Sequence, residues 1–469
     1  MNCGEAWKKS TGNPSIIVAV MDEGVMWPHP DLEANMWVNE DEIFKSDKDN
    51  DGNGYNGDVY GYNFAEMTPV ISWSHERDTG HGTHVAGTIA AVNNNGIGVS
   101  GIAGGSGSND GVKIMSVQIF SGQFGVNQYN EARAIKYAAD NGAVILQCSW
   151  GYNSSLSDPS SSMRGYVNDE HWARHCPLEK EALDYFIHNA GSPNGPIDGG
   201  LAIFAAGNEY AAAAGYPGAY GDFICVSAMD AGFMPASYTN YGRGVDIMAP
   251  GGDSDYHKTV AGSILSTMPP ALTGGTGYGY MDGTSMACPH VSGVAALGLS
   301  YATKLRKKFT ANQFKDLLLQ STRSLEPHFP INKLYYKFFS LAGESNPVLM
   351  ELDKYYAGKV GAGMIDAGKL LTLVENNGVT LDLPNMYVAL GVDNKQTIDL
   401  SLFFDGGKSL TFKAESANPK IASVSIQGSK LIITGNAIGT TAYTVTASDG
   451  KKQVAEITVR RNANGNGWL

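Results

Sequence analysis

Residues 283–290 read GTSMACPH and place Ser285 directly before a predicted helix of small residues, Met286–Leu297. Two upstream stretches carry complementary groups, because residues 81–88 read HGTHVAGT and residues 21–24 read MDEG. A serine hydroxyl becomes a good nucleophile when an imidazole takes its proton, and that imidazole needs a carboxylate to fix its tautomer. The three stretches therefore predict an orienting carboxylate, a base and a nucleophile, in the chain order Asp22, His81, Ser285.

This chain order separates the unrelated folds that carry such a triad, and Asp before His before Ser is the subtilisin order. The chain resembles the subtilisin-like serine proteases, the subtilase family, from about residue 5 to about residue 373. Four further stretches carry the resemblance: SWG at 149–151, AAGNE at 205–209, YPG at 216–218 and APG at 249–251. The resemblance implies a serine endopeptidase that hydrolyses peptide bonds through an acyl-enzyme.

The family pattern assigns a role to each catalytic candidate. Ser285 is the nucleophile, His81 the general base and then the general acid, and Asp22 orients His81. Asn208 matches the position whose side-chain amide donates to the tetrahedral oxyanion together with the Ser285 backbone N–H. Loss of one such donor costs about 3–4 kcal/mol of barrier.

Substrate contacts are also implied by the resemblance. Ser149, Trp150 and Gly151 match the strand whose backbone pairs with an extended peptide, and Glu209 matches the rim of the first specificity pocket. We expect a broad pocket that prefers large apolar or aromatic residues. Trp150 fits a core position that touches no substrate equally well.

Apolar runs of strand length recur along the first half of the chain, separated by helix-like stretches such as Glu131–Asp140 and Glu179–Asn189. The runs are Ile16–Met21, Val112–Phe120, Ala143–Cys148, Leu201–Ala206, Phe223–Ala228 and Val245–Ala249. Unbroken apolar runs are typical of strands covered on both faces, so they predict an α/β fold with a parallel sheet flanked by helices. Asp22, Ser149 and Asn208 follow such runs, where open α/β sheets place their functional sites.

Helix starts are marked by local signals. His81 opens a predicted helix, His81–Ala91, made of small residues. Residues 310–313 read TANQ, a capping box in which Thr310 and Gln313 satisfy two backbone donors, so a further helix is predicted to begin there.

From about Gly378 the apolar pattern changes to period two, and Asp449-Gly450 is a hairpin turn signal. Short alternating strands predict a small all-β sandwich that resembles a bacterial immunoglobulin-like module. We therefore expect a subtilisin-like peptidase domain over residues 1–375, an immunoglobulin-like β-sandwich over 376–461 and a disordered tail over 462–469.

The composition excludes two classes of partner. The formal net charge is 33 − 46 = −13, and the sequence lacks the clusters of Lys and Arg that binding to nucleic acid or to a membrane surface would require. No run of about 18 apolar residues is present, so no membrane span is expected.

No signal peptide is visible, but the resemblance implies a bacterial protein that is secreted or at the cell surface, made with an inhibitory N-terminal prodomain that has been removed. We also expect a monomer that acts on protein or peptide substrates.

The five cysteines are an odd number without paired spacing, so they predict no disulfide framework. Cys148 and Cys225 lie in apolar runs and are predicted to be small buried side chains.

Calcium is the predicted cofactor. Residues 47–58 place oxygen-bearing side chains at positions 1, 3, 5, 7 and 12 of a loop with Gly52 at position 6, which is the ligand spacing of a calcium loop. These candidate ligands are Asp47, Asp49, Asp51, Asn53 and Asp58. Because position 12 is Asp and not the longer Glu, a solvated acidic turn is the alternative.

A second calcium site is implied by the resemblance to the family's structural calcium. It would use Asp31 and the loop Val92–Val99, with Asn94 as the side-chain ligand. That loop is one residue longer than the common form.

Two insertions interrupt the family pattern. Tyr152–Pro177 follows the substrate-pairing strand and is interpreted either as a flap over the cleft or as surface decoration. His328–Lys359 matches no family motif, and its aromatic content predicts packing against the domain.

Two functions remain open from the sequence. The first is a calcium-stabilised serine endopeptidase with an accessory sandwich for docking or stability. The alternative is a catalytically silent scaffold used for protein binding or adhesion. The presence of all four catalytic candidates disfavours the alternative, because binding alone does not require them together.

Overall fold

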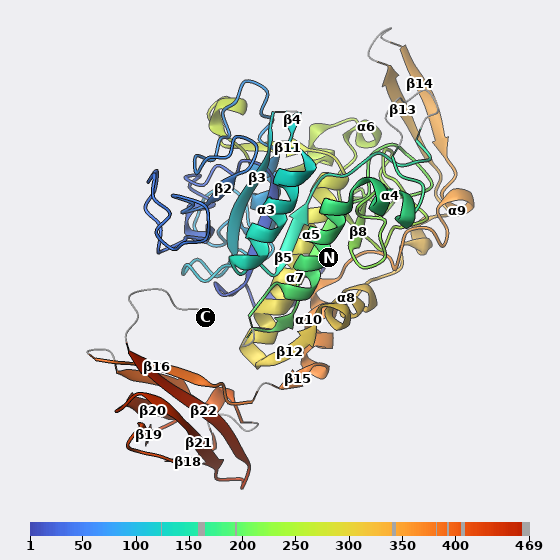
Figure 1. Cartoon of the computed structure of the whole chain (residues 1–469). Coiled ribbons are helices and arrows are strands. Elements are labelled where there is room, and N and C mark those ends of the chain that lie inside the picture. Colours follow the sequence, from blue (N-terminus) through green and yellow to red (C-terminus); the bar gives the residue numbers. More distant parts are fainter. Residues whose placement is uncertain are drawn as a thin grey trace. The chain divides into compact units, whose positions relative to one another are not determined.

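The computed structural model describes residues 1–122, 124–157, 165–192, 195–339, 344–380, 382–391, 394–404 and 409–461 (Figure 1). The chain divides into two compact units. The first comprises residues 1–302 and 309–377, and the second comprises residues 303–308 and the chain from 378 onward. The predicted disordered tail, 462–469, lies outside the described residues.

A parallel sheet forms the centre of the first unit, as the apolar runs predict. Its strand order is β2-β3-β1-β5-β7-β8-β9, and β4 adds antiparallel to β3. The strands are β1 Ile17–Glu23, β2 Gly61–Asn63, β3 Lys113–Ser121, β4 Phe124–Gly125, β5 Ile145–Cys148, β7 Leu201–Ala205, β8 Ile224–Met229 and β9 Ile247–Pro250. Nearly every residue of the central strands β1, β5, β7 and β8 is buried, which explains why both faces of each strand are apolar in sequence.

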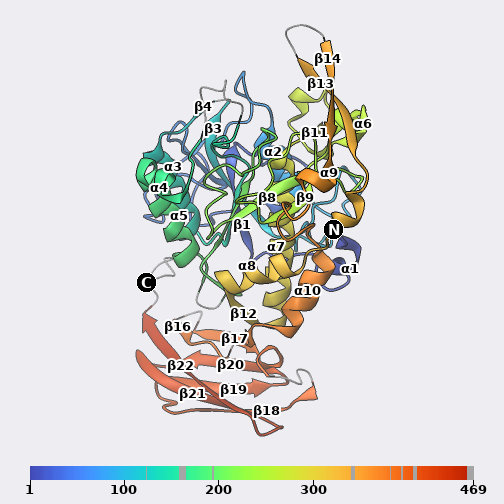
Figure 2. The ribbon, with the colours of Figure 1, turned by 90° about the vertical axis from the view of Figure 1, so that its right-hand side faces the viewer.

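Helices cover the sheet. Helices α3 (Gln128–Asp140) and α5 (Pro177–Asn189) lie side by side on one face, as Figures 1 and 2 show, and share a core with β1, β3, β5 and β7. Helix α2 (His81–Ala90) packs on β1. Helix α7 (Thr284–Leu305) packs on β5 and β7. The contact is seen at Cys288, whose thiol lies 3.4 Å from the Ile203 carbonyl of β7 and 3.7 Å from the Cys148 carbonyl of β5.

Shorter elements complete the first unit. The helices are α1 Cys3–Trp7, α4 Asp169–His175, α6 Ser254–His257, α8 Ala311–Gln320, α9 Leu352–Tyr355 and α10 Ala367–Asn376, with 3-10 turns at Glu33–Asn35, Val260–Gly262, Pro270–Leu272 and Glu326–His328. The strands are β6 Ile197–Asp198, β10 Ile264–Thr267, β11 Tyr278–Met281, β13 Lys333–Phe339 and β14 Glu344–Met350. The predicted capping box is confirmed, because Thr310 accepts from the Gln313 N–H while the Gln313 side chain accepts from the Thr310 N–H.

The two insertions pack into this unit. Trp172 in the first insertion is completely buried and donates to Glu179 at 2.9 Å, so the insertion is not surface decoration. Residues 158–164 of this insertion lie outside the described residues, and its interpretation as a flap stays a prediction. The second insertion forms the β13–β14 hairpin, and aromatic and apolar side chains at its base enter a core with β8 and β9, which confirms the predicted packing.

The second unit is all-β. Its strands form two sheets, β16-β22-β21-β18 and β17-β20-β19, which are antiparallel except for the β16–β22 pair and share one apolar core. The strands are β16 Met386–Leu390, β17 Lys395–Asp399, β18 Phe412–Ser416, β19 Ala422–Gln427, β20 Lys430–Gly435, β21 Gly439–Ala447 and β22 Lys452–Arg461; β15 Val379–Thr380 and a 3-10 turn at Leu400–Leu402 are also present. Strand β12, Lys307–Thr310, includes residues assigned to both units. The predicted hairpin turn is confirmed, because Gly450 lies at φ 89° between β21 and β22.

The cysteines are all free thiols. Cys148, Cys176, Cys225 and Cys288 are buried, and Cys3 is half-buried. Cys148 and Cys225 are therefore small buried side chains, as predicted. None of the helices in the described ranges is both long enough and apolar enough to cross a membrane.

Candidate active site

Asp22 lies at the carboxyl end of β1 and is almost completely buried. One of its carboxylate oxygens, Oδ1, accepts the Glu23 N–H at 2.7 Å and lies 2.7 Å from Nδ1 of His81. The other, Oδ2, has no hydrogen-bond partner among the described residues. A carboxylate in this place fixes the tautomer of His81 with the proton on Nδ1, which leaves Nε2 free to accept a proton.

His81 is the first residue of α2, and Glu23 holds its backbone in place. The Glu23 carboxylate is 6 % exposed and accepts from the His81 N–H at 3.0 Å and from the N–H and hydroxyl of Thr79. The residue before the helix, Gly80, has φ 79° and no side chain to cap it. Glu23 therefore caps α2 from a distant strand, a role that the sequence patterns did not reveal.

The electrostatics of this pair favour a basic imidazole. Burial lowers the pKa of His81, but the Asp22 charge, the hydrogen bond to Asp22 and the Glu23 charge outweigh burial and raise the pKa above its ordinary value. Burial, with the Asp22 charge, also raises the pKa of Glu23.

Ser285 is the second residue of α7 and is half-buried. Its hydroxyl donates to the Ser149 carbonyl at 3.0 Å, and the Ser149 hydroxyl donates to the Ser285 carbonyl at 2.7 Å. In the described part of the chain no hydrogen bond joins Ser285 to His81. The structure thus holds the nucleophile candidate at the end of β5, and catalytic hydrogen bonds are often long or absent before substrate binds.

Trp150 ties the Ser149 segment to the Asp22 segment. Its indole N–H donates to the Met21 carbonyl at 2.8 Å, directly beside Asp22. The ring packs edge-to-face on Phe204 at 5.4 Å and also lines a cavity of about 170 Å³. Trp150 is therefore partly a core residue and partly the wall of an open pocket.

Asn208 follows β7 and is exposed. Its side-chain oxygen accepts from both the N–H and the hydroxyl of Thr284 at 2.9 Å, which identifies the amide oxygen without ambiguity. The amide nitrogen has no acceptor among the described residues and faces Gly283, where an added Cβ would lie 3.8 Å from Nδ2 and 3.7 Å from the Ser285 Cβ. The amide nitrogen of Asn208 and the side chain of Ser285 therefore both lie next to Gly283.

The other two residues predicted to contact substrate, Gly151 and Glu209, differ in how far they are exposed and bonded within the protein. Gly151 is exposed, and Tyr152 after it donates its N–H to the Tyr216 carbonyl at 2.7 Å. Glu209 is half-buried, and its carboxylate accepts from Asn240 at 2.5 Å and from the N–H groups of Ser154 and Asn208 at 3.3 Å. These bonds orient Glu209 as a support of the Asn208 loop.

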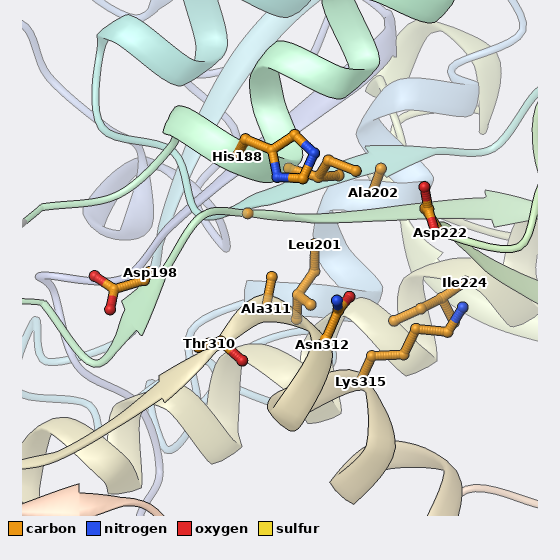
Figure 3. A pocket seen from close by; sticks show the side chains of 12 residues that line it. His188, Asp198, Leu201, Ala202, Asp222, Ile224, Thr310, Ala311, Asn312 and Lys315 are labelled. Atoms are coloured by element: carbon orange, nitrogen blue, oxygen red, sulfur yellow. The ribbon is translucent and has the colours of Figure 1, made fainter.

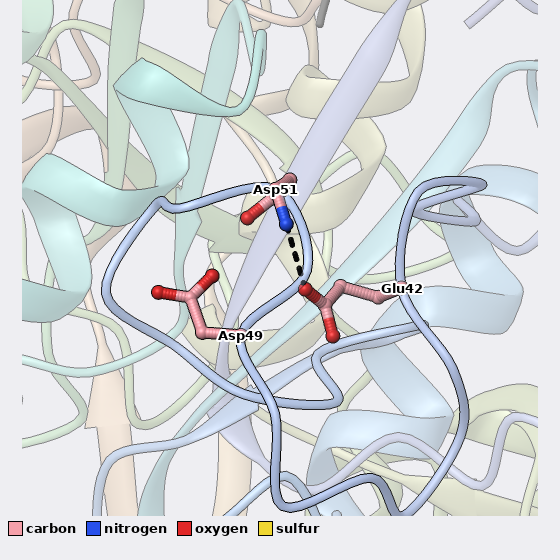
Figure 4. Close-up of side chains that lie close together, drawn as sticks. All are labelled: Glu42, Asp49 and Asp51. Carbon is pink, nitrogen blue, oxygen red and sulfur yellow. Dashed lines mark hydrogen bonds between the residues drawn. The ribbon is translucent and has the colours of Figure 1, made fainter. Parts of the chain in front are cut away.

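The candidate calcium loop brings only some of its predicted ligands together. Oxygens of Asp49, Asp51 and Glu42 lie within 4.8 Å of one another (Figure 4). Glu42 is buried and accepts the Asp51 N–H at 3.2 Å; it lies upstream of the loop, and the twelve-residue spacing could not identify it. Asp47 is exposed and stands outside this group.

The last two predicted ligands of the loop face inward. Asp58 is completely buried and accepts from the Tyr137 hydroxyl at 2.7 Å and from the Asn53 amide at 3.1 Å. Burial raises the pKa of Asp58 to about 6. The half-buried Asn53 also donates to Asp51 at 3.0 Å, so its amide links Asp51 to Asp58.

At the second candidate site the structure brings a different asparagine to Asp31. The buried Asp31 carboxylate accepts from the Asn95 amide at 2.6 Å and from the Val99 N–H at 2.9 Å. The predicted Asn94 is exposed and donates to the Ser106 carbonyl instead. The loop turns at Asn94, which has φ 57°, and its role as a calcium ligand stays a prediction.

A further cavity of about 160 Å³ lies at the start of β7, near Asp198 at one end and Lys315 at the other (Figure 3). Lys315 donates to the carbonyls of Gly221 and Phe223 at 2.6 Å. This cavity contains none of the catalytic candidates and lies at the opposite strand ends from Asp22.

Comparison with known proteins identifies the family of the first unit. The family model described as subtilase family matches residues 13–339. Two curated relatives are an extracellular protease of Xanthomonas campestris pv. campestris (33 % identity, 64 % of this chain, 47 % of the relative) and the major intracellular serine protease of Bacillus subtilis (30 %, 69 % and 80 %). The chain spans about half the length of the first of these.

Solved structures show the same fold. A protease of Pseudoalteromonas arctica PAMC 21717 aligns with a TM-score of 0.50 at 27 % identity, covering 80 % of this chain and 94 % of that one. The prenylagaramide maturation protease PagA aligns with a TM-score of 0.51 at 22 % identity, covering 79 % and 98 %. In the second unit, a model described as the pilus formation protein N terminal region matches residues 416–460. The family model covers well over half of the sequence, and the chain belongs to the subtilase family.

Proposed function

We propose that this protein is a serine endopeptidase. The observation that carries the proposal is the 2.7 Å contact between buried Asp22 and His81. It lies at the carboxyl ends of the parallel strands, where Ser285 is also held. His81 removes the hydroxyl proton of Ser285 as the oxygen attacks the carbonyl carbon of the substrate. The imidazolium that forms is stabilised by Asp22 and then returns the proton to the leaving amine.

Asn208 supplies the oxyanion contact in this mechanism. Its amide oxygen is fixed by two bonds from Thr284, so the N–H groups need no reorganisation to meet negative charge on the substrate oxygen. The Ser285 backbone N–H is the second donor. The acyl-enzyme on Ser285 is then hydrolysed by water, with His81 again as the base.

The substrate is an extended peptide in this proposal. It pairs with the backbone of Ser149, Trp150 and Gly151 as an added strand. Gly151 is exposed and leaves its backbone open to such pairing. Glu209 acts from the pocket rim, mainly by supporting Asn208.

The test is labelling of the full chain with a fluorophosphonate, together with casein hydrolysis. Wild type should be labelled and active, Ser285→Ala should be neither, and Ser15→Ala, which changes an exposed serine, should match wild type. Folded wild type that neither labels nor cleaves would favour the alternative, a silent scaffold for protein binding or adhesion.

Calcium is proposed as a structural ion at the loop that contains Asp49 and Asp51, with Glu42 as an additional ligand. The donor set fits, because Ca²⁺ prefers several carboxylate and carbonyl oxygens. A bound ion would stabilise the folded state by mass action. A chelator should therefore lower the melting temperature of wild type but leave that of Glu42→Gln nearly unchanged; an equal response in both would contradict this site.

Secretion of the protein and an accessory role for its second unit are also proposals. Relatives named extracellular protease support secretion, whereas the Bacillus subtilis relative is named intracellular, and fractionation of the native host distinguishes the two. The two-sheet core of the second unit supports an immunoglobulin-like accessory module. We also propose that the protein acts as a monomer after loss of an inhibitory prodomain, which light scattering of the active species would test.

A further inference from the structure

The cavity beside Trp150 opens next to the segment proposed to pair with substrate. Phe120, Val126 and Trp150 contribute walls that are largely apolar, and Gly151 and Tyr152 continue the wall along the chain. Its volume of about 170 Å³ is many times the space that one water molecule requires. The cavity can therefore receive a whole side chain.

An acidic residue lines this otherwise apolar cavity. Glu131, in the first turn of α3, is 7 % exposed, and its Oε1 receives no hydrogen bond within the described ranges. The side chain of Glu179, from the neighbouring helix α5, is completely buried and hydrogen-bonds to Glu131. Two carboxyl groups from adjacent helices thus meet behind the pocket.

Among the described residues, no cationic side chain is bonded to this pair. Glu179 accepts from the indole N–H of Trp172 at 2.9 Å and from the hydroxyl of Tyr152 at 3.4 Å, and both donors are neutral. No Lys, Arg or His side chain forms an ion pair or hydrogen bond with either glutamate in the described part of the chain. Burial raises the pKa of both groups, and the Glu179 charge raises that of Glu131 further.

The lack of a basic partner for this pair is the reason to expect a ligand. Burial favours the protonated form of each carboxyl group, whereas an opposite charge close by favours the ionised form. Among the described residues Lys333 supplies such a charge to Asp230 and Asp253, and no basic side chain bonds to Glu131 or Glu179. A cation that enters through the pocket would supply the missing charge.

We propose that this pocket binds a basic side chain, lysine or arginine, of the peptide substrate, with Glu131 as the recognition residue and Glu179 as its support. The aliphatic stem of the basic side chain lies along Trp150 and Phe120, and its charged end reaches Glu131. This proposal rests on the proposed function, because a peptide reaches the pocket by pairing with Ser149–Gly151. It assigns the enzyme a specificity for basic residues at a position away from the scissile bond.

The test uses the full chain and internally quenched peptides. One position at a time carries Lys, Arg, norleucine or Glu, and norleucine matches the length of lysine without its charge. At one position on the acyl side of the scissile bond, kcat/KM should be about tenfold higher for Lys or Arg than for norleucine, equal to ~1.4 kcal/mol. In Glu131→Gln this ratio should fall close to one.

Controls separate charge recognition from a general defect. Each variant is compared with its own norleucine peptide, so an overall loss of activity cancels in the ratio. Glu181→Gln changes an exposed glutamate on α5 and should keep the wild-type ratio. Glu179→Gln should lower the ratio less than Glu131→Gln.

Three results would overturn the pocket proposal: no preference for a basic residue in active wild type, the same preference in Glu131→Gln, or a preference for Glu. The same peptides are also titrated onto Ser285→Ala, which measures binding without turnover. Equal affinity for the Lys and norleucine peptides there would reject the pocket. Absence of labelling and cleavage with retained Lys-selective binding would instead reject the peptidase function.

Discussion

Among the described residues, two pairs of buried acidic side chains differ in their partners. Asp230 and Asp253 share the ammonium group of Lys333, at 2.7 Å and 2.6 Å, and all three are buried. Glu131 and Glu179 meet behind a pocket with no basic side chain bonded to them in the described ranges. A buried acid pair with its own lysine is already neutralised, whereas a pair beside a pocket and without a bonded basic side chain can receive a cation from a ligand.

The active-site candidate stands between these two cases. Asp22 and Glu23 are also buried neighbours, and their counterion is the imidazole of His81, which gains or loses its charge with pH. Changes in the three acid pairs should therefore have distinct effects, on turnover, on stability and on pH dependence.

Removal of the Asp22 charge should have the largest effect. On the proposed mechanism Asp22→Asn lowers kcat by about 10⁴-fold, because His81 loses both its tautomer control and the anion that stabilises the imidazolium. The measurement is kcat on a peptide substrate with matched protein concentrations. Asp353→Asn, at an exposed position, is the control. A loss of only a few-fold would contradict the assignment of Asp22.

Removal of the structural cation should affect folding. Lys333→Met removes the ammonium that Asp230 and Asp253 share and leaves His257, 3.4 Å from Asp230, as the nearby basic group, which should cost about 3–5 kcal/mol of unfolding free energy. Denaturant titration measures the loss, and Lys354→Met, an exposed lysine, serves for comparison. Replacing both aspartates with asparagine in the Lys333→Met background should recover part of the stability; no recovery would show that packing, and not charge, is responsible.

Glu23→Gln should move the pH profile. Activity requires neutral His81, so the acidic limb of kcat/KM follows the pKa of His81, which Asp22 and Glu23 raise. Without the Glu23 charge the imidazolium is less stable, the pKa falls and the acidic limb moves to lower pH. Glu76→Gln, at an exposed site, should leave the limb in place. An unmoved limb in Glu23→Gln would show that Glu23 is already protonated in that range.

The unpaired glutamates should give the smallest effect, in the pH dependence of stability. Their folded pKa values are raised, so the folded state holds protons that the unfolded state releases above the ordinary glutamate pKa of 4.5. Their contribution to stability is therefore lost as pH rises from that value through the raised pKa. Melting temperatures across this range should fall less in Glu179→Gln than in wild type; parallel curves would contradict the sign.

Much of the fold could be predicted because its signals are local. Unbroken apolar runs identify the strands of the parallel sheet, and the Thr310–Gln313 capping box identifies the start of α8. The chain order of the motifs predicts that Asp22 and His81 meet, and the structure brings them to 2.7 Å. Their catalytic roles remain predictions.

The residues that were missed depend on contacts between distant segments. Glu131 and Glu179 each lie in the first turn of a helix, where acidic residues are common because they suit the helix dipole and are usually exposed. Only the side-by-side packing of α3 and α5 buries them together. Glu23, Glu42 and Asn95 likewise acquire their partners from loops that no local pattern connects.

The four buried thiols make the molecule its own reporter of unfolding. Cys148, Cys176, Cys225 and Cys288 are enclosed, whereas Cys3 is only half-buried. A thiol-reactive dye should modify Cys3 quickly and the other four only when the sheet and its helices open. The slow phase of dye uptake would therefore count global opening events under native conditions, without any engineered probe.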